Sequence, residues 1–372
     1  MKFTILKKDL DKNIENISSA INNANFLIPL RGVYLKLTSE GLYFIGTDNE
    51  LTIRSFVETD KLIKVDELGE ILVNHLLFKN VVKKLQGEIE IKVKDNFLVI
   101  SSGDDLFELN IMNFEEYPIL DFSSIEGCRF LVDSKDIRKA IKNTIFATNS
   151  ESIEFVLGCL NLVAKNSNLT ISGTDKYRIA TETIQINTNS EFDISIYAKK
   201  LKDFIPSNYD GEIEINVNEH KIETKIDNML IQSKVVEFPY KDISNVFPKV
   251  EDLKYKIEID KKELSDLINK ATAISSDSNY KLEFRVNKDI FSISGHKDEM
   301  GSTLVKTKKF TFTNNNEFNS ENEIYFCLNH KFLKESISVF EGTIHILVDK
   351  VIKRVLIISN SNKTNRQLIG TT

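Results

Sequence analysis

The sequence predicts an α+β protein built from three tandem copies of one unit, with two helices on antiparallel sheets in each copy. Three observations predict this fold: an apolar pattern that recurs at fixed spacing, a strand that ends in a glycine turn, and an alternating strand after each second helix. The chain has 372 residues, which is enough for two or three domains that each bury a core.

Each copy opens with the same apolar pattern. Residues at offsets 0, 2, 7 and 11 are apolar, and the set recurs twice at intervals of 127 residues. The three sets are Phe3, Ile5, Leu10 and Ile14, then Phe130, Val132, Ile137 and Ile141, then Ile257, Ile259, Leu264 and Ile268. The first pair alternates as in a strand and the second pair is one helical turn apart. Every copy is therefore predicted to begin with a strand, a short turn and a helix.

Two further landmarks recur in the same order. A strand that ends in a glycine turn occurs at Tyr43–Glu50, Thr170–Tyr177 and Ser292–Glu299. A helix that leads through a glycine or a short loop into an alternating strand occurs at His75–Val93, Ala198–Val217 and His330–Val348. Segments without a clear period fall near residues 122 and 250, which predicts domains at 1–122, 123–250 and 251–372.

Positive charge is gathered on the predicted helices, although the whole chain has a formal net charge of −6. The helices expected at Asn74–Leu85 and Ser134–Asn149 each carry +3, and Ala198–Phe204 carries +2. Asn329–Phe340 carries +1, and Lys7–Asn22 and Asp260–Ser275 are neutral. The six helices thus sum to +9 and the rest of the chain to −15.

The helix at Ser134–Asn149 is predicted to separate apolar and basic faces. Ile137, Ile141 and Ile145 recur every four residues and are expected to face the sheet. Lys135, Arg138, Lys139 and Lys142 fall on one exposed stripe. For one helix such a stripe is most simply a solvated face, but three basic helices on an acidic chain favour a surface that contacts phosphates.

The sequence contains no zinc-finger spacing, recognition-helix signature or aromatic run that would read bases. Contact with a phosphate backbone is therefore expected to be independent of base sequence. The candidate DNA-facing residues are Lys79, Lys83, Lys135, Arg138, Lys139, Lys142, Lys199, Lys200 and Lys202.

An enzyme is one alternative, because Asp48 and Asp175 recur after a strand and a glycine. The third copy has Gly295–Lys297 (GHK) there, and an Asp in this position is more simply the acceptor of an Asx turn. The histidines lack metal-ligand spacing, and the chain has no phosphate-binding loop or nucleophile motif. We expect no catalytic residue, no metal and no cofactor.

A repeat-built interaction scaffold is a second alternative. Such a scaffold would share the threefold repetition, but it has no reason to gather Lys and Arg onto helices. Cys128, Cys159 and Cys327 are far apart and are expected to be reduced thiols. The chain shows no secretory signal and no apolar stretch near the roughly 20 residues that span a bilayer, so we expect a cytoplasmic protein.

The most specific segments are GTDNE (Gly46–Glu50), GTDKYRIA (Gly173–Ala180) and SKVVEFPYKDISNVFPK (Ser233–Lys249). With these segments the whole chain resembles the bacterial DNA polymerase III beta subunit family, the sliding clamps. The resemblance implies three copies of the DNA-clamp fold and a head-to-tail homodimer that closes as a ring around double-stranded DNA, with helices lining the hole. The two-domain clamps of archaea and eukaryotes, which trimerise, are an alternative, and three repeats per chain favour the dimer.

The resemblance also implies a non-catalytic role in the DNA polymerase III holoenzyme, at the nucleoid in the bacterial cytoplasm. The implied partners are the replicative polymerase alpha subunit, the clamp loader, repair polymerases and ligase. The implied dimer surfaces are the strand Leu106–Asn110, with Phe107 and Leu109, and a region near Ile274. Ser275 stands where the family often has a second apolar residue. Phe107 and Leu109 could instead belong to the core of their own domain.

A partner-peptide pocket between the second and third domains is the last implied site. Its candidate residues are Val156, Thr174, Lys176, Tyr177, Arg178, Ile179, Lys241, Asn245, Val246, Leu368 and Ile369. Lys176, Lys241 and Asn245 replace the Gly, Pro and Arg that are common in the family, and the chain ends in Gly370–Thr372 without the usual Pro and Arg. Ala24 replaces an Arg that contacts DNA in some members. We therefore expect a more polar pocket and a larger share of DNA contact for the basic helices.

Overall fold

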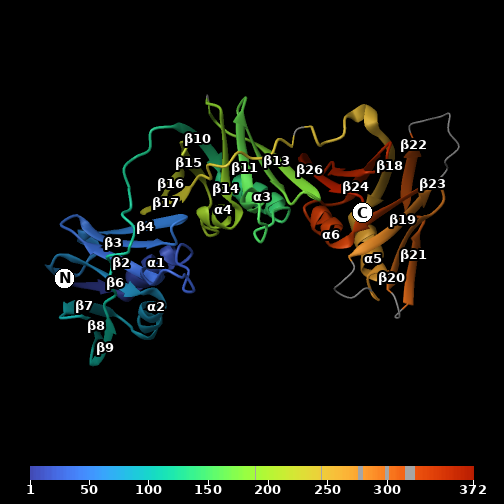
Figure 1. Cartoon of the computed structure of the whole chain (residues 1–372). Helices are drawn as coiled ribbons and strands as arrows, with labels where there is room; N and C mark the ends of the chain where they lie inside the picture. The colour runs from blue at the N-terminus through green and yellow to red at the C-terminus, as the bar shows by residue number, and fades with distance from the viewer. Residues whose placement is uncertain (189, 244, 275–279, 298–300, 315–322) are drawn as a thin grey trace. The chain divides into compact units, whose positions relative to one another are not determined.

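The computed structural model describes residues 1–188, 190–243, 245–274, 280–297, 301–314 and 323–372 (Figure 1). The chain forms two compact units: Met1–Ser134 with Lys199–Glu237, and Lys135–Ala198 with Phe238–Thr372. The predicted middle domain, 123–250, therefore contributes to both units.

Two antiparallel sheets and the helices against them form the first unit. The smaller sheet has the order β5-β1-β7-β8-β9 and the larger β10-β15-β16-β17-β4-β3-β2-β6. Helices α1 and α2 pack against each other, and α1 contacts strands of both sheets. The helices are α1 (Lys7–Ser18), α2 (His75–Lys84) and α4 (Ala198–Phe204, in this unit from Lys199), with the 3-10 turns η1 (Ile28–Arg31) and η2 (Thr59–Lys61). The strands are β1 (Lys2–Leu6), β2 (Gly32–Leu37), β3 (Gly41–Thr47), β4 (Leu51–Glu58), β5 (Lys64–Glu67), β6 (Gly69–Asn74), β7 (Glu88–Lys94), β8 (Phe97–Ser102), β9 (Asp105–Asn110), β10 (Cys128–Asp133), β15 (Glu212–Val217), β16 (Lys221–Ile226) and β17 (Met229–Lys234).

The second unit has the same kind of construction. Its larger sheet has the order β14-β11-β12-β13-β26-β25-β24-β18-β22 and its smaller sheet β21-β20-β19-β23, and α5 and α6 pack against each other. The helices are α3 (Ser134–Ile145, in this unit from Lys135), α5 (Lys261–Ala271) and α6 (His330–Ser338), with η3 (Phe155–Gly158) and η4 (Val250–Asp252). The strands are β11 (Cys159–Lys165), β12 (Asn168–Thr174), β13 (Arg178–Gln185), β14 (Phe192–Tyr197), β18 (Leu253–Asp260), β19 (Lys281–Asn287), β20 (Phe291–Lys297), β21 (Gly301–Thr307), β22 (Phe310–Asn314), β23 (Glu323–Asn329), β24 (Thr343–Asp349), β25 (Arg354–Ser359) and β26 (Asn362–Gly370).

The six predicted helices are confirmed, and the structure shortens most of them at their ends. Helix α1 ends at Ser18 rather than Asn22, because the Ala20 and Ile21 amides donate to carbonyls only three residues back. Apolar spacing continues through such a tight turn, so it does not mark where the α-helix stops. Asn74 and Asn329 cap α2 and α6 by accepting backbone N–H bonds.

The recurring glycine has one physical cause in all three copies: a helix end crosses close to the strand. A Cβ at Gly46 would lie 2.7 Å from Ile21 Cγ1. A Cβ at Gly173 would lie 2.8 Å from the Thr144 carbonyl oxygen, and one at Gly295 would lie 2.9 Å from that of Ala271. Real Cβ atoms do not approach backbone oxygens this closely, so the landmark marks the contact between a helix and its sheet.

Two strand pairings continue the sheets from one sequence copy to the next. In the first unit β17 pairs with β4, and in the second unit β26 pairs with β13. At the second pairing the buried Glu182 carboxylate accepts from the Asn143, Asn362 and Asn365 side-chain amides at 2.7, 2.9 and 2.7 Å. Neutral amide donors thus satisfy the buried carboxyl group at the seam.

Candidate functional site

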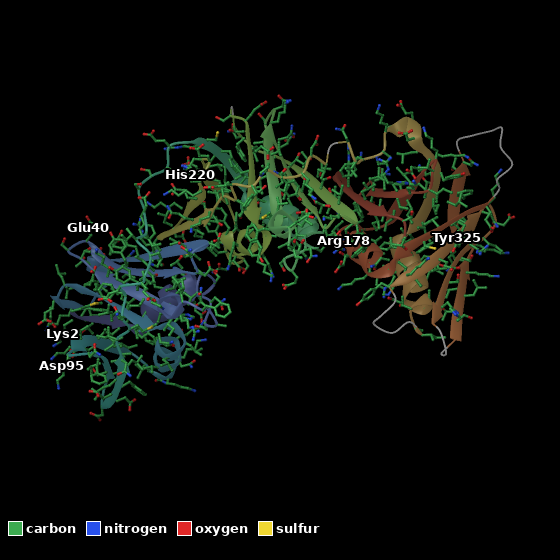
Figure 2. The ribbon with its side chains drawn as sticks, in the orientation of Figure 1. Lys2, Glu40, Asp95, Arg178, His220 and Tyr325 are labelled. Atoms are coloured by element: carbon green, nitrogen blue, oxygen red, sulfur yellow. The ribbon has the colours of Figure 1, made fainter. Side chains whose placement is uncertain are left out.

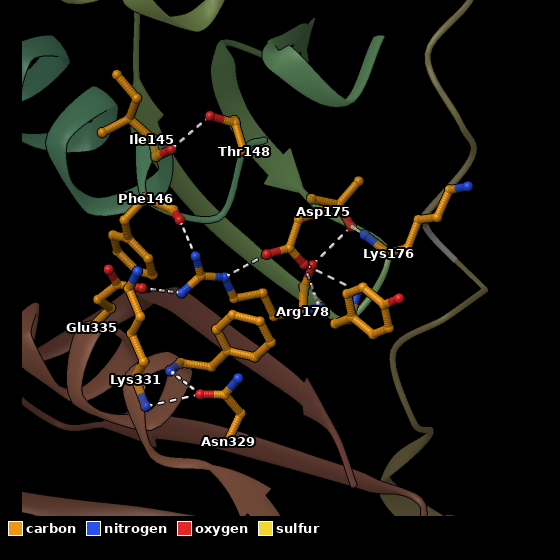
Figure 3. A network of polar contacts seen from close by, with 12 residues as sticks. Ile145, Phe146, Thr148, Asp175, Lys176, Arg178, Asn329, Lys331 and Glu335 are labelled. Atoms are coloured by element: carbon orange, nitrogen blue, oxygen red, sulfur yellow. Dashed lines mark hydrogen bonds and ion pairs between the residues drawn. The ribbon is translucent and has the colours of Figure 1, made fainter. Parts of the chain in front are cut away.

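Arg178, the first residue of β13, joins three elements of the second unit (Figures 2 and 3). Its side chain is buried, its Nε donates to Asp175 Oδ2 at 2.9 Å, and it forms an ion pair with Glu335 of α6. It also donates to the Phe146 carbonyl oxygen, just beyond α3, and lies over the Phe332 ring at 4.3 Å. With its donors used in this way, Arg178 fixes the shape of the site rather than offering charge to a ligand.

The turn before β13 presents Tyr177 to solvent. Asp175 Oδ1 accepts from the Tyr177 and Arg178 amides at 3.0 and 3.1 Å, which is the predicted Asx turn. Tyr177 is 68% exposed and stacks on Phe332 with 6.5 Å between ring centroids. Lys176 has φ of 80°, a backbone conformation that favours glycine, so the residue that departs from the family pattern occupies a strained position.

The Glu154 carboxylate binds Lys176 and Lys241, the two lysines that replace the residues common in the family. Glu154 forms ion pairs with Lys176 and with Lys241, whose Nζ lies 2.6 Å from Glu154 Oε2. These lysines hold the pKa of the Glu154 carboxyl below its ordinary value. The two added charges are therefore partly neutralised inside the chain, which limits the polarity they give to the surface.

Beside this turn an apolar cluster lies across β13, β26, β25 and β24. Ile179, Leu356 and Leu368 are its buried members, and Ile179 is the register partner of Leu368. The partly buried side chains packed against it are Ile243, Phe247, Leu253, Leu347 and Ile358. Of these residues only Ile179 and Leu368 were predicted from the sequence. Leu347 alternates with the buried Ile346 and Val348, so the sequence indicates that it lies on the other face of its strand. The sequence does not indicate that this face carries the apolar cluster.

The remaining predicted pocket residues differ in what their side chains can reach. Ile369 is fully buried in the core of the second unit, on the opposite face of β26 from Leu368, so it cannot line the same surface. Thr174 is also buried, and its hydroxyl donates to the Arg178 carbonyl oxygen at 2.7 Å. Val156 is half-buried in η3, whereas Asn245 and Val246 are exposed.

The basic stripe on α3 lies as the periodicity predicts. Lys135, Lys139 and Lys142 are exposed and Arg138 is half-buried. Ile137 and Ile141 are buried, whereas Ile145 is only half-buried. Lys199 and Lys202 of α4 are likewise exposed.

Three of the other candidate lysines form ion pairs within the first unit. Lys79 and Lys83 of α2 both contact Glu15 of α1, at 2.7 and 3.2 Å, and lower the pKa of its carboxyl. Lys200 of α4 pairs with Asp48. These contacts join different elements, so spacing within one helix could not reveal them, and they reduce the positive charge that these lysines offer to a ligand.

The predicted dimer surfaces lie at sheet edges or close to them. Strand β9 is the last strand of the smaller sheet in the first unit, with Phe107 and Leu109 half-buried and Leu106 62% exposed. In the second unit Ile274 is 37% exposed after α5, and Leu304 on the edge strand β21 is 62% exposed. Ser275 lies outside the described residues.

Features that would indicate an enzyme have structural roles. Asp48 accepts from the Glu50 and Leu51 amides, as Asp175 does in its own turn, so both predicted Asx turns are confirmed. Within the described ranges no group of three or more His, Cys, Asp or Glu side chains could hold a metal ion, and the three cysteines form no disulfide. In the same part of the chain no helix combines the length and apolar character needed to cross a membrane.

Comparisons with known proteins identify the family. Residues 1–121 match the model of the DNA polymerase III beta subunit N-terminal domain, and residues 131–242 match that of its central domain. The chain is 29% identical to the beta sliding clamp of Mycoplasmopsis pulmonis, covering 100% of this chain and 99% of the relative. It is 26% identical to that of Bacillus subtilis, covering 99% and 98%.

Solved structures show the same fold. The sliding clamp of Bacillus subtilis has a TM-score of 0.90 at 22% identity and covers 100% of this chain and 99% of its own. The DNA polymerase III beta subunit of Pseudomonas aeruginosa has a TM-score of 0.90 at 19% identity and covers 100% of both chains. The chain belongs to the bacterial DNA polymerase III beta subunit family, the beta sliding clamps.

Proposed function

We propose that this chain is a DNA sliding clamp, which pairs head to tail with a second copy, closes around duplex DNA and tethers the replicative polymerase. The observation that carries the proposal is the positive charge on its helices, +9 on the predicted set against −6 for the whole chain. Lys and Arg side chains displace the counterions condensed on DNA without reading bases, so such a surface can slide.

Partners are proposed to dock on the apolar cluster beside Tyr177. The cluster is bordered by an exposed aromatic ring and by the exposed Val246, which gives a short peptide an apolar anchor point. The partner classes would be the polymerase alpha subunit, the clamp loader, repair polymerases and ligase. The chain would itself be non-catalytic and act at the nucleoid in the bacterial cytoplasm.

Retention on DNA of different topology tests this function. The protein would be loaded by the clamp loader onto a nicked circle and onto the same DNA linearised, and then separated from free protein in high salt. A clamp stays on the circle and slips from the ends of the linear DNA. If the protein is lost equally from circular and linear DNA, it does not enclose the DNA. An interaction scaffold would give this result, because its retention does not depend on DNA topology. Turnover of a substrate by the chain alone would indicate an enzyme instead.

A further inference from the structure

The first unit carries a hollow of about 640 Å³ between the larger sheet and the segment that follows β9. Five aromatic side chains line it: Tyr34, Tyr43, Phe114, Tyr117 and Phe122. The ring centroids of Tyr34 and Tyr117 are 5.6 Å apart, and those of Tyr34 and Phe114 are 6.4 Å apart. The size and the mostly apolar lining are typical of a ligand site.

Arg54 on β4 brings a cation into this aromatic lining. Its guanidinium lies 4.4 Å from the Phe122 ring centroid and 5.5 Å from that of Tyr43. Among the described residues no carboxylate or carbonyl oxygen accepts a hydrogen bond from this guanidinium. Burial lowers the pKa of the guanidinium, and the charge of the Glu223 carboxylate opposes this shift. Five N–H donors held against aromatic rings without an acceptor favour a planar anion such as a carboxylate.

Arg54 is the basic residue of the lining that can bind an anion, because the other one is already paired. The other basic residue of the lining, Lys36, has its Nζ 3.3 Å from Glu70 Oε2, and Tyr34 Oη donates to the same carboxylate at 2.6 Å. The Tyr117 hydroxyl is buried and has no hydrogen-bond partner in the part of the chain that the structure describes, so a second donor of the lining is also unused there.

The second copy has the same hollow with a different lining. Positions 127 residues later place Asn161, Thr170 and Thr181 where the first copy has Tyr34, Tyr43 and Arg54. This second hollow has a volume of about 730 Å³ and is also covered by the segment that leads to the next copy. The second hollow has two aromatic side chains, Tyr240 and Phe247, and its arginine, Arg366, comes from β26 of the third copy. The repeated fold therefore creates the hollow, and the sequence of the first copy lines it with five aromatic rings and an arginine from its own sheet.

We propose that the aromatic hollow of the first copy binds a linear peptide of a partner protein in which an aromatic or large aliphatic side chain adjoins an Asp or Glu. The rings would take the apolar side chain, and Arg54 would bind the carboxylate with two parallel hydrogen bonds. Phe114 is 45% exposed and Ile119 fully exposed at the rim, so the flanking peptide residues would cover apolar surface that a small anion would leave bare.

A nucleic-acid strand suits the hollow less well. Glu115 and the Glu70 carboxylate flank it, and of its two basic side chains Lys36 is already paired. A phosphate backbone would meet this negative charge at each step. The hollow is made of other residues than the apolar cluster beside Tyr177, so its ligand would be additional to the polymerase tether.

Fluorescence of a tryptophan peptide tests the proposal directly, because the chain itself contains no Trp. The probes are acetyl-Gly-Trp-Glu-Gly-amide and its Gln counterpart, titrated with the full chain in the absence of DNA. We expect saturable binding and about tenfold tighter binding of the Glu peptide, as for one hydrogen-bonded charge pair. Arg54→Gln should remove this preference, and Arg54→Lys, which keeps the charge without the planar fork, should retain part of it.

Matched controls separate this site from the others. Thr181→Ala in the second hollow and Tyr177→Ala beside the apolar cluster should leave the binding unchanged, and circular dichroism checks that each variant is folded. The proposal is overturned if the wild-type chain shows no saturable binding at millimolar peptide, or if Arg54→Gln still prefers the Glu peptide. Displacement of the Glu peptide by oligo-dT would also overturn it in favour of a nucleic-acid site.

Discussion

Gly46, Gly173 and Gly295 show how a missing side chain sets the distance between a helix and its sheet. In each copy a helix-end backbone or side-chain atom lies within 3 Å of where a Cβ would be. The contact at Gly173 is with a backbone oxygen, which cannot turn away as a flexible side chain could.

Replacing Gly173 by Ala should therefore destabilise the second unit by about 1–3 kcal/mol, the usual cost of an overpacked contact. Gly370→Ala is the matched control, because its Cβ would meet only the Tyr177 carbonyl oxygen at 3.4 Å. Urea unfolding followed by circular dichroism measures both variants. Equal midpoints for the two would contradict the close-approach explanation.

His75 is a buried residue whose charge state couples pH to stability. Its imidazole lies 3.0 Å from Ser18 Oγ and 3.2 Å from Asn23 Oδ1. Burial, together with the nearby Lys79 charge, lowers the pKa of this histidine to about 4. The folded protein thus holds His75 neutral, whereas the unfolded chain takes up a proton below about pH 6.5.

The stabilisation from a neutral His75 should be fully present above pH 6.5 and lost as the pH falls from 6.5 to about 4. The loss should approach about 3 kcal/mol at pH 4. The check is the difference in unfolding free energy between the wild type and His75→Gln at pH 7, 5.5 and 4, which cancels the carboxylates common to both proteins. A constant difference across this range would contradict a buried neutral imidazole.

At the scale of residues, the sequence predicted which residues lie near the site better than it predicted where their side chains point and which residues they contact. It predicted Asp48 and Asp175 as turn acceptors because an Asx turn is a local interaction. It placed Ile369 in the pocket although the side chain points into the core, because a one-residue step along a strand reverses the face. It also treated Arg178 as part of the pocket, while its partners Glu335 and Phe146 are distant in sequence.

At the scale of elements, the periodicity of apolar residues predicted all six helices. It did not predict which charged side chains of the helices form ion pairs with other elements. Helix α4 has the predicted bounds, and on α3 the basic stripe, Ile137 and Ile141 lie as expected, whereas Ile145 is only half-buried. The lysines of α2 differ, because Glu15 on α1 binds two of them. Three of the four basic side chains of the α3 stripe are exposed, so this stripe is used to test DNA contact.

Replacing Lys135, Arg138, Lys139 and Lys142 by Glu should weaken retention on circular DNA and leave the dimer intact. If each side chain neutralises one phosphate, the salt dependence of DNA affinity should lose roughly one unit of log–log slope per residue. The measurement is salt-dependent retention of the loaded protein.

The control replaces Lys61, Lys92, Lys94 and Lys225, which are exposed and lie outside the α-helices, by Glu and causes the same change in net charge. Equal losses in the two variants would indicate a general charge effect. Unchanged loading and sliding of the α3 variant would contradict the assignment of this helix to the DNA-facing surface.

At the scale of the whole molecule, three sequence copies become two compact units. The three copies could be predicted from the sequence because the apolar spacing that identifies each copy is a local pattern. It could not predict that the middle copy contributes to both units, since strand pairing between copies, β4 with β17 and β13 with β26, depends on long-range contacts. The predicted domain bounds at 122 and 250 stay a prediction.

Phe107→Asp should shift the protein from dimer towards the 42.6 kDa monomer, because it places a charge on the edge strand proposed to pair with a second copy. Val351→Asp is the control, since Val351 is 55% exposed in a loop. Sedimentation over a range of concentrations measures the effect, and a dimer of unchanged strength for Phe107→Asp would exclude this edge from the interface.

The pairing of β17 with β4 also decides how this gene could be divided. A fragment that stops at residue 122 would keep β4 but lose the partner that covers its outer edge, leaving a row of unused amides and carbonyls beside Ile53 and Ser55. Such a fragment should self-associate when expressed alone and recover solubility when the piece containing β17 is supplied in trans. Because each compact unit is assembled from two separate stretches of the chain, a single cut between the repeats cannot leave the first unit whole.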